Sequence, residues 1–483
     1  MQRPHIIPNL TVLDLHSNLL SGEIPIPPES AVYVDYSSNN FNSSIPLELG
    51  NFLTSSVFFS LSNNNLTGTI PQSICNASNL QVLDLSNNRF SGTIPQCLIE
   101  NCTATLGVLN LRNNILIGNI SWTFPKRCAL MTLDFNGNNL VGQIPKSLAN
   151  CTKLEVLNLG YNNISDNFPC FLQSSSHLRV LNLRSNSFQG VVHCEGHHKN
   201  SWTKLQIIDL ALNNFSGLLP NKYFLQWKAM MVDGGNGQSD LDHLHYEFLK
   251  LNHFYYQDTV TVTIKGVEFE LVKILTVFTS IDFSMNSFQG EIPDTFGTLK
   301  YLYALNLSHN VLTGHIPSSL GNLTQLESLD LSMNKLSGSI PEQLASLTFL
   351  SFLNLSFNRL VGRIPIGTQI QSFSKTSFEG NGGLCGAPLN TNCSHVQMPA
   401  GVLPLTPDED GDLDFEPGIY VSFAVGFVVG LGSFLGALVL CKRWRQWYYK
   451  HVDQVLERTF HLEERQRRRN RRKRAYRDPI RRL

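Results

Sequence analysis

The chain repeats one short pattern thirteen times, and this repetition constrains its fold more than any other feature. In the copy LDLSNNRFSGTIP, Leu83 and Leu85 alternate with polar neighbours, as in a short strand with one buried face. The amide of Asn88 can bond to backbone groups where the chain turns inward, and Gly92 permits a tight turn. The register of the copies is marked by asparagines: Asn18, Asn39, Asn64, Asn88, Asn114, Asn138, Asn162, Asn186, Asn213, Asn286, Asn310, Asn334 and Asn358.

Most steps between these asparagines are 24 residues long. One such unit cannot bury its own apolar face, so stacked neighbours must share a continuous core. The sequence therefore predicts a curved solenoid with a parallel β-sheet on its concave face and an irregular or 3₁₀ convex side.

One step, from Asn213 to Asn286, is 73 residues long and therefore contains an insertion, which we place at 221–279. Around Lys265 and Gly266 the insertion alternates β-branched and polar residues, which predicts a short hairpin or edge strand. Long insertions on a rigid scaffold usually carry function, so we expect ligand or partner contact here. The alternative is that the hairpin only patches the solenoid where the insertion interrupts it.

Charge is distributed unevenly, although 37 Lys and Arg balance 37 Asp and Glu overall. Residues 1–441 hold 21 basic and 32 acidic residues, whereas 442–483 hold 16 and 5. Directly before this step, the 22 uncharged residues 419–440 would span about 33 Å as a helix, enough to cross about 30 Å of hydrocarbon. Because Lys and Arg favour the cytoplasmic side, we expect a single-pass type I protein of the plasma membrane with a transmembrane helix at 419–441.

Potential glycosylation sites agree with an extracellular N-terminal side, because all thirteen Asn-x-Ser/Thr sites precede the apolar run. The first residues, MQRPHIIPNLTVLDL, lack the apolar core of a signal peptide, so we expect a chain without its original N-terminal part. The expected glycosylation sites are Asn9, Asn42, Asn65, Asn76, Asn101, Asn119, Asn150, Asn163, Asn214, Asn306, Asn322, Asn354 and Asn392.

Nine of the ten cysteines also precede the apolar run, where disulfides persist. Residues at equal phase in adjacent turns lie about 5 Å apart, within disulfide range. Cys102 and Cys128 share a phase, as do Cys170 and Cys194. A pairing of Cys151 with Cys170 is also open, and an odd number of candidates leaves one thiol over.

The end of the repeats is expected to carry a cap, because an open solenoid end exposes its core. Cys385 and Cys393 lie eight residues apart directly after the last repeat. We expect them to form a disulfide that closes this cap.

The pattern LxLxxNxLxGxIP resembles the plant-type leucine-rich repeat. The order of parts resembles a plant receptor-like protein, in the style of the Cf-type and wilt-resistance-type immune receptors. Two features depart from this family: the N-terminal Cys-Trp cap with its leading repeats is absent, and the tail is unusually rich in Arg. The expected domains are repeats at 1–220, an island at 221–279, four repeats at 280–366, a Cys-containing cap at 367–394, an acidic juxtamembrane stretch at 395–418, the membrane helix at 419–441 and a basic cytoplasmic tail at 442–483.

The resemblance implies a leucine-rich-repeat receptor without a kinase, which senses an extracellular ligand and signals in plant defence through partner kinases. The partners it implies are an adaptor receptor-like kinase, a co-receptor kinase and a peptide, protein or glycan ligand. It also implies that island residues Tyr256, Lys265 and Gly266 contact a ligand or co-receptor. Alternatives are a developmental peptide co-receptor, a non-signalling inhibitor or scaffold, and a truncated relic.

Further binding residues are expected at solvent-facing strand positions beside the island, because alternate strand residues point out of the concave face. Small residues in the membrane run would form one stripe for helix–helix contact with the adaptor kinase. The two sets are Arg179, Arg184, Gln206, Asp209, Tyr303 and His309 on the strands, and Gly426, Gly430, Ser433 and Ala437 in the helix.

Other chemistry is not expected. A tail of 42 residues is too short for a kinase, and no catalytic constellation stands out, so we expect no enzyme and no cofactor. The string HCEGHH at 193–198 fits no standard set of metal ligands. The string RRRNRRKR at 467–474 would hold anionic lipid beside the membrane rather than nucleic acid.

Overall fold

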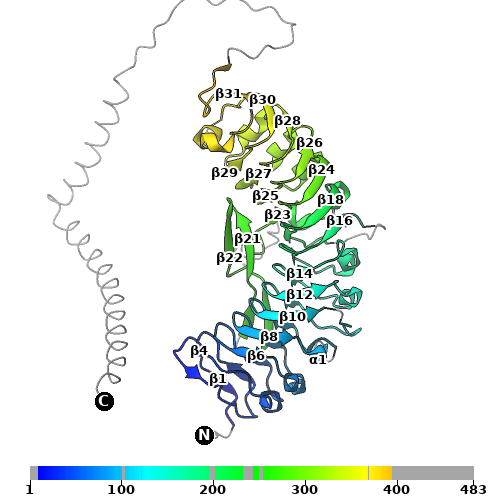
Figure 1. The fold of residues 1–483 in the computed structure, drawn as a ribbon, viewed down its shortest axis with the longest axis vertical. Coiled ribbons are helices and arrows are strands. Elements are labelled where there is room, and N and C mark those ends of the chain that lie inside the picture. Colours follow the sequence, from blue (N-terminus) through cyan, green and yellow to red (C-terminus); the bar gives the residue numbers. More distant parts are fainter. Residues whose placement is uncertain are drawn as a thin grey trace, which may run out of the picture. The chain divides into compact units, whose positions relative to one another are not determined.

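The computed structural model describes residues 9–100, 104–120, 122–194, 202–231, 243–249, 254–367 and 369–393. Within them the chain forms the expected solenoid, with one strand per repeat in a single 13-stranded parallel sheet (Figure 1). In order, its strands are β1 (Val12–Asp14), β3 (Tyr33–Asp35), β5 (Phe58–Ser60), β7 (Val82–Asp84), β9 (Val108–Asn110), β11 (Thr132–Asp134), β13 (Val156–Asn158), β15 (Val180–Asn182), β17 (Ile207–Asp209), β23 (Ser280–Asp282), β25 (Ala304–Asn306), β27 (Ser328–Asp330) and β29 (Phe352–Asn354).

A second set of parallel strands follows the register asparagines on the side of the solenoid. These strands are β2 (Ser21–Gly22), β4 (Asn40–Phe41), β6 (Thr67–Thr69), β8 (Arg89–Thr93), β10 (Ile115–Asn119), β12 (Asn139–Gly142), β14 (Asn163–Ile164), β16 (Gln189–Val191), β18 (Asn214–Leu218), β24 (Ser287–Glu291), β26 (Val311–Thr313), β28 (Ser337–Gly338), β30 (Arg359–Arg363) and β31 (Gly383–Cys385).

The convex side consists of short helical turns, mostly 3₁₀, as the sequence predicts. They are η1 (Leu49–Phe52), η2 (Gln72–Asn76), α1 (Gln96–Glu100), η4 (Lys146–Asn150), η5 (Cys170–Ser174), α2 (Asn221–Phe224), η6 (Lys228–Met230), η7 (Asp294–Thr298), η8 (Ser318–Asn322), η9 (Glu342–Ser346), η10 (Ile370–Ser372) and η11 (Lys375–Ser377).

The register asparagines form the expected ladder of backbone contacts. The side-chain amide of Asn88 donates to the carbonyls of Leu61, in the preceding repeat, and of Leu85, at 2.9 and 3.2 Å. In return, the side-chain oxygen of Asn114 accepts the backbone N–H of Phe90 at 2.9 Å. Each buried asparagine thus joins its own turn to the repeat before it, which satisfies backbone groups that the inward turn would otherwise leave unpaired.

The core runs without interruption from the first repeats to the cap and is made of the leucine, isoleucine and phenylalanine positions of the pattern. It continues past the insertion, because β17 pairs directly with β23 and β18 with β24. The ring of Phe215 in β18 stacks on Phe188 and Phe288 with centroid distances of 5.9 and 6.3 Å. The repeats before and after the insertion therefore form one solenoid.

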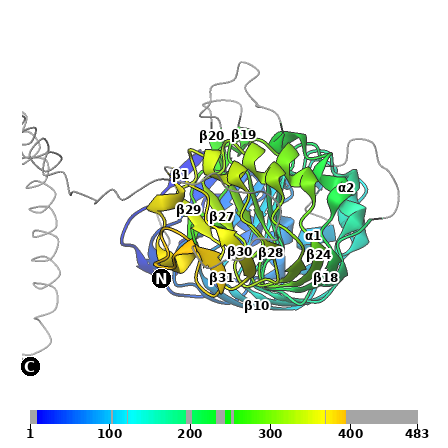
Figure 2. The same ribbon diagram turned by 90° about the horizontal axis from the view of Figure 1, so that it is seen from above.

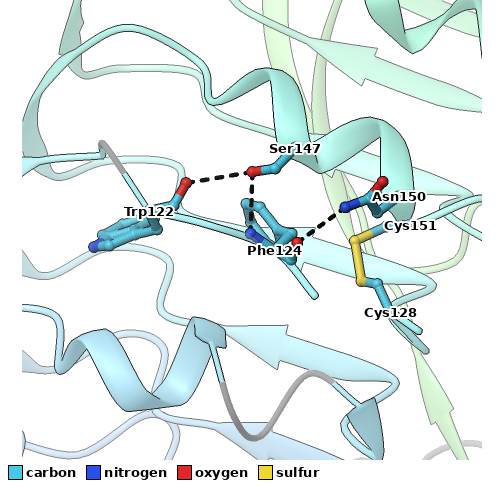
Figure 3. Close-up of a disulfide and its surroundings, with 6 residues drawn as sticks. All are labelled: Trp122, Phe124, Cys128, Ser147, Asn150 and Cys151. Carbon is cyan, nitrogen blue, oxygen red and sulfur yellow. Dashed lines mark hydrogen bonds between the residues drawn. A yellow bond between two sulfur atoms is a disulfide. The ribbon is translucent and has the colours of Figure 1, made fainter. Parts of the chain in front are cut away.

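The disulfides correct one expectation from the sequence. Cys128 pairs with Cys151 rather than with Cys102, which lies outside the described residues (Figure 3). Their Cα atoms are 4.7 Å apart, because hydrogen bonds hold η4 over the segment before Cys128: Asn150 donates to the carbonyl of Phe124 at 3.0 Å. Equal phase was the wrong criterion here, since Cys151 stands one residue earlier in its repeat and points back toward Cys128.

Three further disulfides are present. The expected pairs Cys170–Cys194 and Cys385–Cys393 are confirmed, which excludes a bond between Cys151 and Cys170. The pair Cys75–Cys97 joins two neighbouring convex turns and was not predicted.

Among the described residues, no helix has both the length and the apolar character needed to cross a membrane. The expected membrane helix at 419–441, with Gly426, Gly430, Ser433 and Ala437, lies outside the described residues, as do the acidic stretch and the basic tail.

Candidate functional site

The island folds back over the concave sheet instead of projecting from the solenoid. Its described part contains two antiparallel hairpins, which Figure 1 shows inside the arc of the concave strands. The first joins β19 (His245–Leu249) to β20 (Phe254–Gln257), and the second joins β21 (Val260–Ile264) to β22 (Val267–Leu271). Seen from above in Figure 2, β19 and β20 lie on the opposite side of the solenoid from the lateral strands β10 and β18.

The first hairpin rests on an apolar patch of the early repeats. Phe248 stacks on Phe58 with centroids 5.1 Å apart, and Phe58 stacks on Tyr33 at 4.5 Å. Val82 and Val108 complete this cluster, and both are fully buried. These side chains come from four successive strands of the concave sheet, where a solvent-facing strand would carry polar residues. The hairpin therefore covers an apolar patch that would otherwise face solvent.

A glycine makes room for the same hairpin. Gly107 lies just before β9, and a Cβ atom at this position would stand 2.3 Å from the ring of Tyr246. Because that distance is shorter than any real contact, a larger residue here would displace Tyr246. The side chain of Tyr246 also reaches Gln81, to which its hydroxyl donates a long hydrogen bond of 3.5 Å.

The second hairpin rests on a second apolar patch, farther along the sheet. Val260 and Val262 of β21 pack in a cluster with Val156, Val180 and Ile207, one from each of three successive concave strands. All five side chains are at most 3% exposed. The two hairpins together cover the concave face from β3 to β17.

Polar contacts between the two patches are centred on Arg112, which is 6% exposed. Its guanidinium donates to the hydroxyls of Thr259 and Thr261 at 3.0 and 2.8 Å and forms an ion pair with Glu270 at 2.9 Å. One arginine of the solenoid therefore holds both strands of the second hairpin.

Arg184 plays the same part three repeats later. Its guanidinium contacts Asp209 at 3.5 Å, Asp282 at 3.1 Å and Glu268 of the island at 3.1 Å. Asp209 and Asp282 are buried at the same position of adjacent strands. Burial and the neighbouring carboxylate of Asp282 raise the pKa of Asp209, while Arg184 opposes this shift. Arg184 thus compensates the charges of the buried Asp209 and Asp282. It also binds the island through its ion pair with Glu268.

The tip of the second hairpin reaches the last four repeats. Lys265 and Gly266 form its two-residue turn, both with positive φ (57° and 75°), as hairpin turns of this length require. The ammonium group of Lys265 lies 3.3 Å from Glu327, and its backbone N–H donates to the hydroxyl of Ser328 at 3.1 Å. The island therefore connects the early repeats to the late ones across the concave face.

Beyond the tip, the concave side opens into a cavity of about 650 Å³ between the last three repeats and the cap. The exposed side chains of His309, Met333 and Phe357 stand in one row along its edge, at the same position of successive repeats. The cap contributes Phe373 and Glu379 on the other side, and serine and threonine hydroxyls line much of the remainder. This mixture of apolar and hydroxyl groups suits an extended peptide better than a strongly charged ligand.

The structure separates the expected strand residues into two groups. Arg184, Gln206 and Asp209 were expected to face solvent, which is wrong: all three are at most 8% exposed beneath the island. The amide of Gln206 donates to the carbonyls of Leu275 and Phe278 at 2.9 and 3.2 Å, so it holds the returning end of the island. Arg179 is partly exposed and forms an ion pair with Glu155 at 3.3 Å.

The other expected residues lie at the cavity or in the contact between the island and the concave sheet, which we call the seam. Tyr256 is half-buried in the seam, where its hydroxyl accepts from the amide of Asn110 at 2.7 Å. Lys265 and Gly266 lie exposed at the tip, Tyr303 is half-buried, and His309 is exposed at the cavity.

Among the expected glycosylation sites, Asn354 has a special position, because it lies on the concave sheet and lines the cavity. Asn306 occupies the same position two repeats earlier. In contrast, Asn65, Asn163 and Asn214 are exposed on the lateral strands or next to them. A glycan on Asn354 would compete for space with a ligand in the cavity, whereas glycans on the lateral residues would not.

Family models and curated relatives agree with the repeats. Three models described as leucine-rich repeat match the chain. The first matches residues 278–336 and 300–360, the second 9–31, 57–77, 79–101 and 129–151, and the third 150–167. Receptor-like protein 33 of Arabidopsis thaliana is 44% identical over 457 residues, which cover 91% of this chain and 49% of that protein. Receptor-like protein 7 of the same plant is 48% identical over 444 residues, or 88% of this chain and 44% of that protein. The chain thus spans about half the length of these curated relatives.

Solved structures show the same fold. The PEPR1–AtPEP1 complex matches with a TM-score of 0.57 and 29% identity, over 74% of this chain and 43% of that one. The Arabidopsis receptor kinase HAESA, solved with the peptide hormone IDA and the co-receptor SERK1, matches with a TM-score of 0.54 and 26% identity over 80% and 63% of the two chains. The chain therefore belongs to the leucine-rich-repeat proteins, and over most of its length it resembles the plant receptor-like proteins among them.

Proposed function

We propose that this chain acts as a cell-surface receptor without a kinase of its own, which senses an extracellular, pathogen-derived ligand and signals through a partner receptor kinase in plant defence. The names of its relatives support the receptor part of this proposal. A solved neighbour supports it as well, since the Arabidopsis receptor kinase HAESA is described in complex with a peptide hormone and a co-receptor. The apolar run at 419–441 supports attachment to the membrane.

The observation that carries the proposal is the arrangement of the island and the open cavity. The island covers the concave face from β3 to β17, so a ligand cannot reach those strands while the island is closed. The cavity beside the last three repeats stays open, and the exposed apolar side chains of Met333 and Phe357 lie along its edge. Met333 and Phe357 are 43% and 49% exposed, so their burial by a ligand would contribute to binding. We therefore place the ligand at this cavity, in contact with the island tip.

Truncation of the Met333 and Phe357 side chains tests this placement of the ligand. Plant cells that express the full receptor with Met333→Ala and Phe357→Ala should lose at least about 90% of their response to a fractionated microbial extract, because these two side chains form the edge of the site. The measurement is the oxidative burst of the treated cells. The matched control is Phe349→Ala, which removes another exposed ring (59%) that does not line the cavity. An unchanged response of the double variant would remove the cavity from the proposal.

The partner kinase is proposed to bind through the membrane segment, where Gly426, Gly430, Ser433 and Ala437 would share one face of an ideal helix with 100° per residue. The acidic stretch Asp408–Glu416 would orient the pair rather than hold it, since exposed ion pairs contribute only about 0–1 kcal/mol each. Changing Gly426 and Gly430 to Leu should abolish co-precipitation with the adaptor kinase, whereas Val428→Leu with Val429→Leu should not. Full association of the glycine variant would show that the segment only anchors the protein.

A developmental role is the second candidate, because one solved neighbour is described in complex with a peptide hormone and its co-receptor. The same cells distinguish the two roles. A response to synthetic plant peptides but not to microbial fractions would favour the developmental receptor.

A further inference from the structure

The seam between island and solenoid contains a carboxyl group without a cationic partner. Asp258 follows β20 directly and is 5% exposed. Its carboxylate oxygen accepts a hydrogen bond of 2.7 Å from the hydroxyl of Thr132 in β11, and among the described residues it forms no ion pair. A buried ionised carboxylate is costly unless a cation or several donors compensate it. Closure of the island therefore places Asp258 where its charge is unfavourable.

The groups that surround this carboxyl are mostly acidic. On the solenoid, Asp134 is buried in β11 and Glu155 precedes β13, and the charges of both act on Asp258. On the island, Tyr256 of β20 and His245 of β19 interact electrostatically with Asp258, and of these two only the imidazole can carry positive charge.

On the solenoid side of the described seam, the guanidinium of Arg112 contacts Thr259, Thr261 and Glu270 rather than Asp258. Its charge favours the ionised form of Asp134. Protonation of Asp258 removes the uncompensated negative charge from this seam when the island is closed.

We propose that the island is a proton-dependent lid, which is held closed on the concave face while Asp258 is protonated and loosens when that carboxyl ionises. Opening would uncover the two apolar patches, Tyr33 with Phe58, Val82 and Val108, and Val156 with Val180 and Ile207. The lid would thereby switch the receptor between a closed concave face in acid and an accessible apolar one near neutrality. This inference concerns the island alone and holds whether or not the cavity is the ligand site.

The sign of the pH dependence follows from the titration of the seam. Burial, and after it the charges of Asp134 and Glu155, raise the pKa of Asp258 to about 7. Burial likewise raises the pKa of Asp134 to about 6, against the effect of Arg112. Since an open island returns Asp258 toward its ordinary value of 3.8, closure takes up a proton. The closed state is therefore most favoured below pH 4, and this advantage is lost as the pH rises toward 7.

Hydrogen exchange of the full chain in detergent micelles tests the lid. Protection factors of amides in 254–264, corrected for the intrinsic effect of pH, should fall at least about tenfold between pH 5 and pH 8. The variant Asp258→Asn mimics the protonated carboxyl and should lose most of this fall in protection. The matched control is Asp330→Asn, at the ladder position equivalent to Asp134 but outside the seam, which should behave like the wild type.

Two outcomes would overturn the proposal: constant protection of the wild-type amides, or an unchanged pH dependence in Asp258→Asn. If the asparagine variant does not fold, Thr132→Val serves instead. The hydrogen bond from Thr132 favours the ionised carboxylate, so its loss should move the midpoint of the pH dependence upward. A midpoint that does not move, or moves downward, would equally contradict the lid.

Discussion

Replacement of Arg184 by alanine is expected to lower the free energy of unfolding by about 3–5 kcal/mol, because it leaves buried acids without their cation. Asp209 and Asp282 are 3% and 5% exposed, and both contact this guanidinium. The loss should be larger at pH 8 than at pH 5: burial already raises the pKa of Asp209 and Asp282, so acid neutralises them. Denaturant unfolding of the purified chain at the two pH values measures both effects.

Arg179→Ala is the matched control for this prediction. Arg179 forms a single ion pair with Glu155, and both side chains are about a quarter exposed (25% and 23%). Its removal should cost no more than about 1 kcal/mol. Equal losses for the two variants would show that Arg184 is an ordinary surface charge and that the island is not held as described.

Truncation of Phe215 to alanine is expected to cost about 3–5 kcal/mol, as is usual for a buried aromatic ring. Phe215 is fully buried and stacks between Phe188 of the earlier repeats and Phe288 of the first repeat after the island. The change should therefore destabilise the repeats on both sides of the insertion together. Hydrogen exchange that reports protection separately for 156–219 and 280–354 measures this coupling.

Phe349→Ala serves as control, because its ring is 59% exposed and contributes little to the core. If Phe215→Ala weakened protection only in the earlier repeats, the two parts of the solenoid would be independent units joined by the island.

The solenoid itself could be read from the sequence because each of its determinants is local. Leu83 and Leu85 give the strand, Asn88 gives the ladder and Gly92 gives the turn, all within one repeat, and the period transfers them to every other copy. Disulfides were less predictable, since a pair such as Cys128–Cys151 depends on how one convex turn leans on the next. The position of a cysteine within its repeat does not show how far one convex turn is shifted relative to the next.

The position of the island was missed because it results from contacts far apart in the sequence. Arg112 and Glu270, or Phe58 and Phe248, meet only after the solenoid has formed. A signal nevertheless existed. Strand positions that should face solvent carry apolar side chains in many of the early repeats and small or polar ones in three of the last four. Such an apolar stripe on an otherwise polar face indicates that another part of the chain covers it.

Cysteine labelling on the concave face tests most directly whether the island covers it. Val82→Cys and Val180→Cys place thiols at two strand positions that are fully buried under the hairpins, whereas Ser351→Cys places one at an exposed position near the cavity. At pH 5 a soluble maleimide should modify the two covered thiols at least about tenfold more slowly than the third. Adding Gly107→Val, whose side chain collides with Tyr246, should accelerate labelling at position 82. If the thiols at 82 and 180 reacted as fast as that at 351 in the otherwise unchanged protein, the closed island would be refuted.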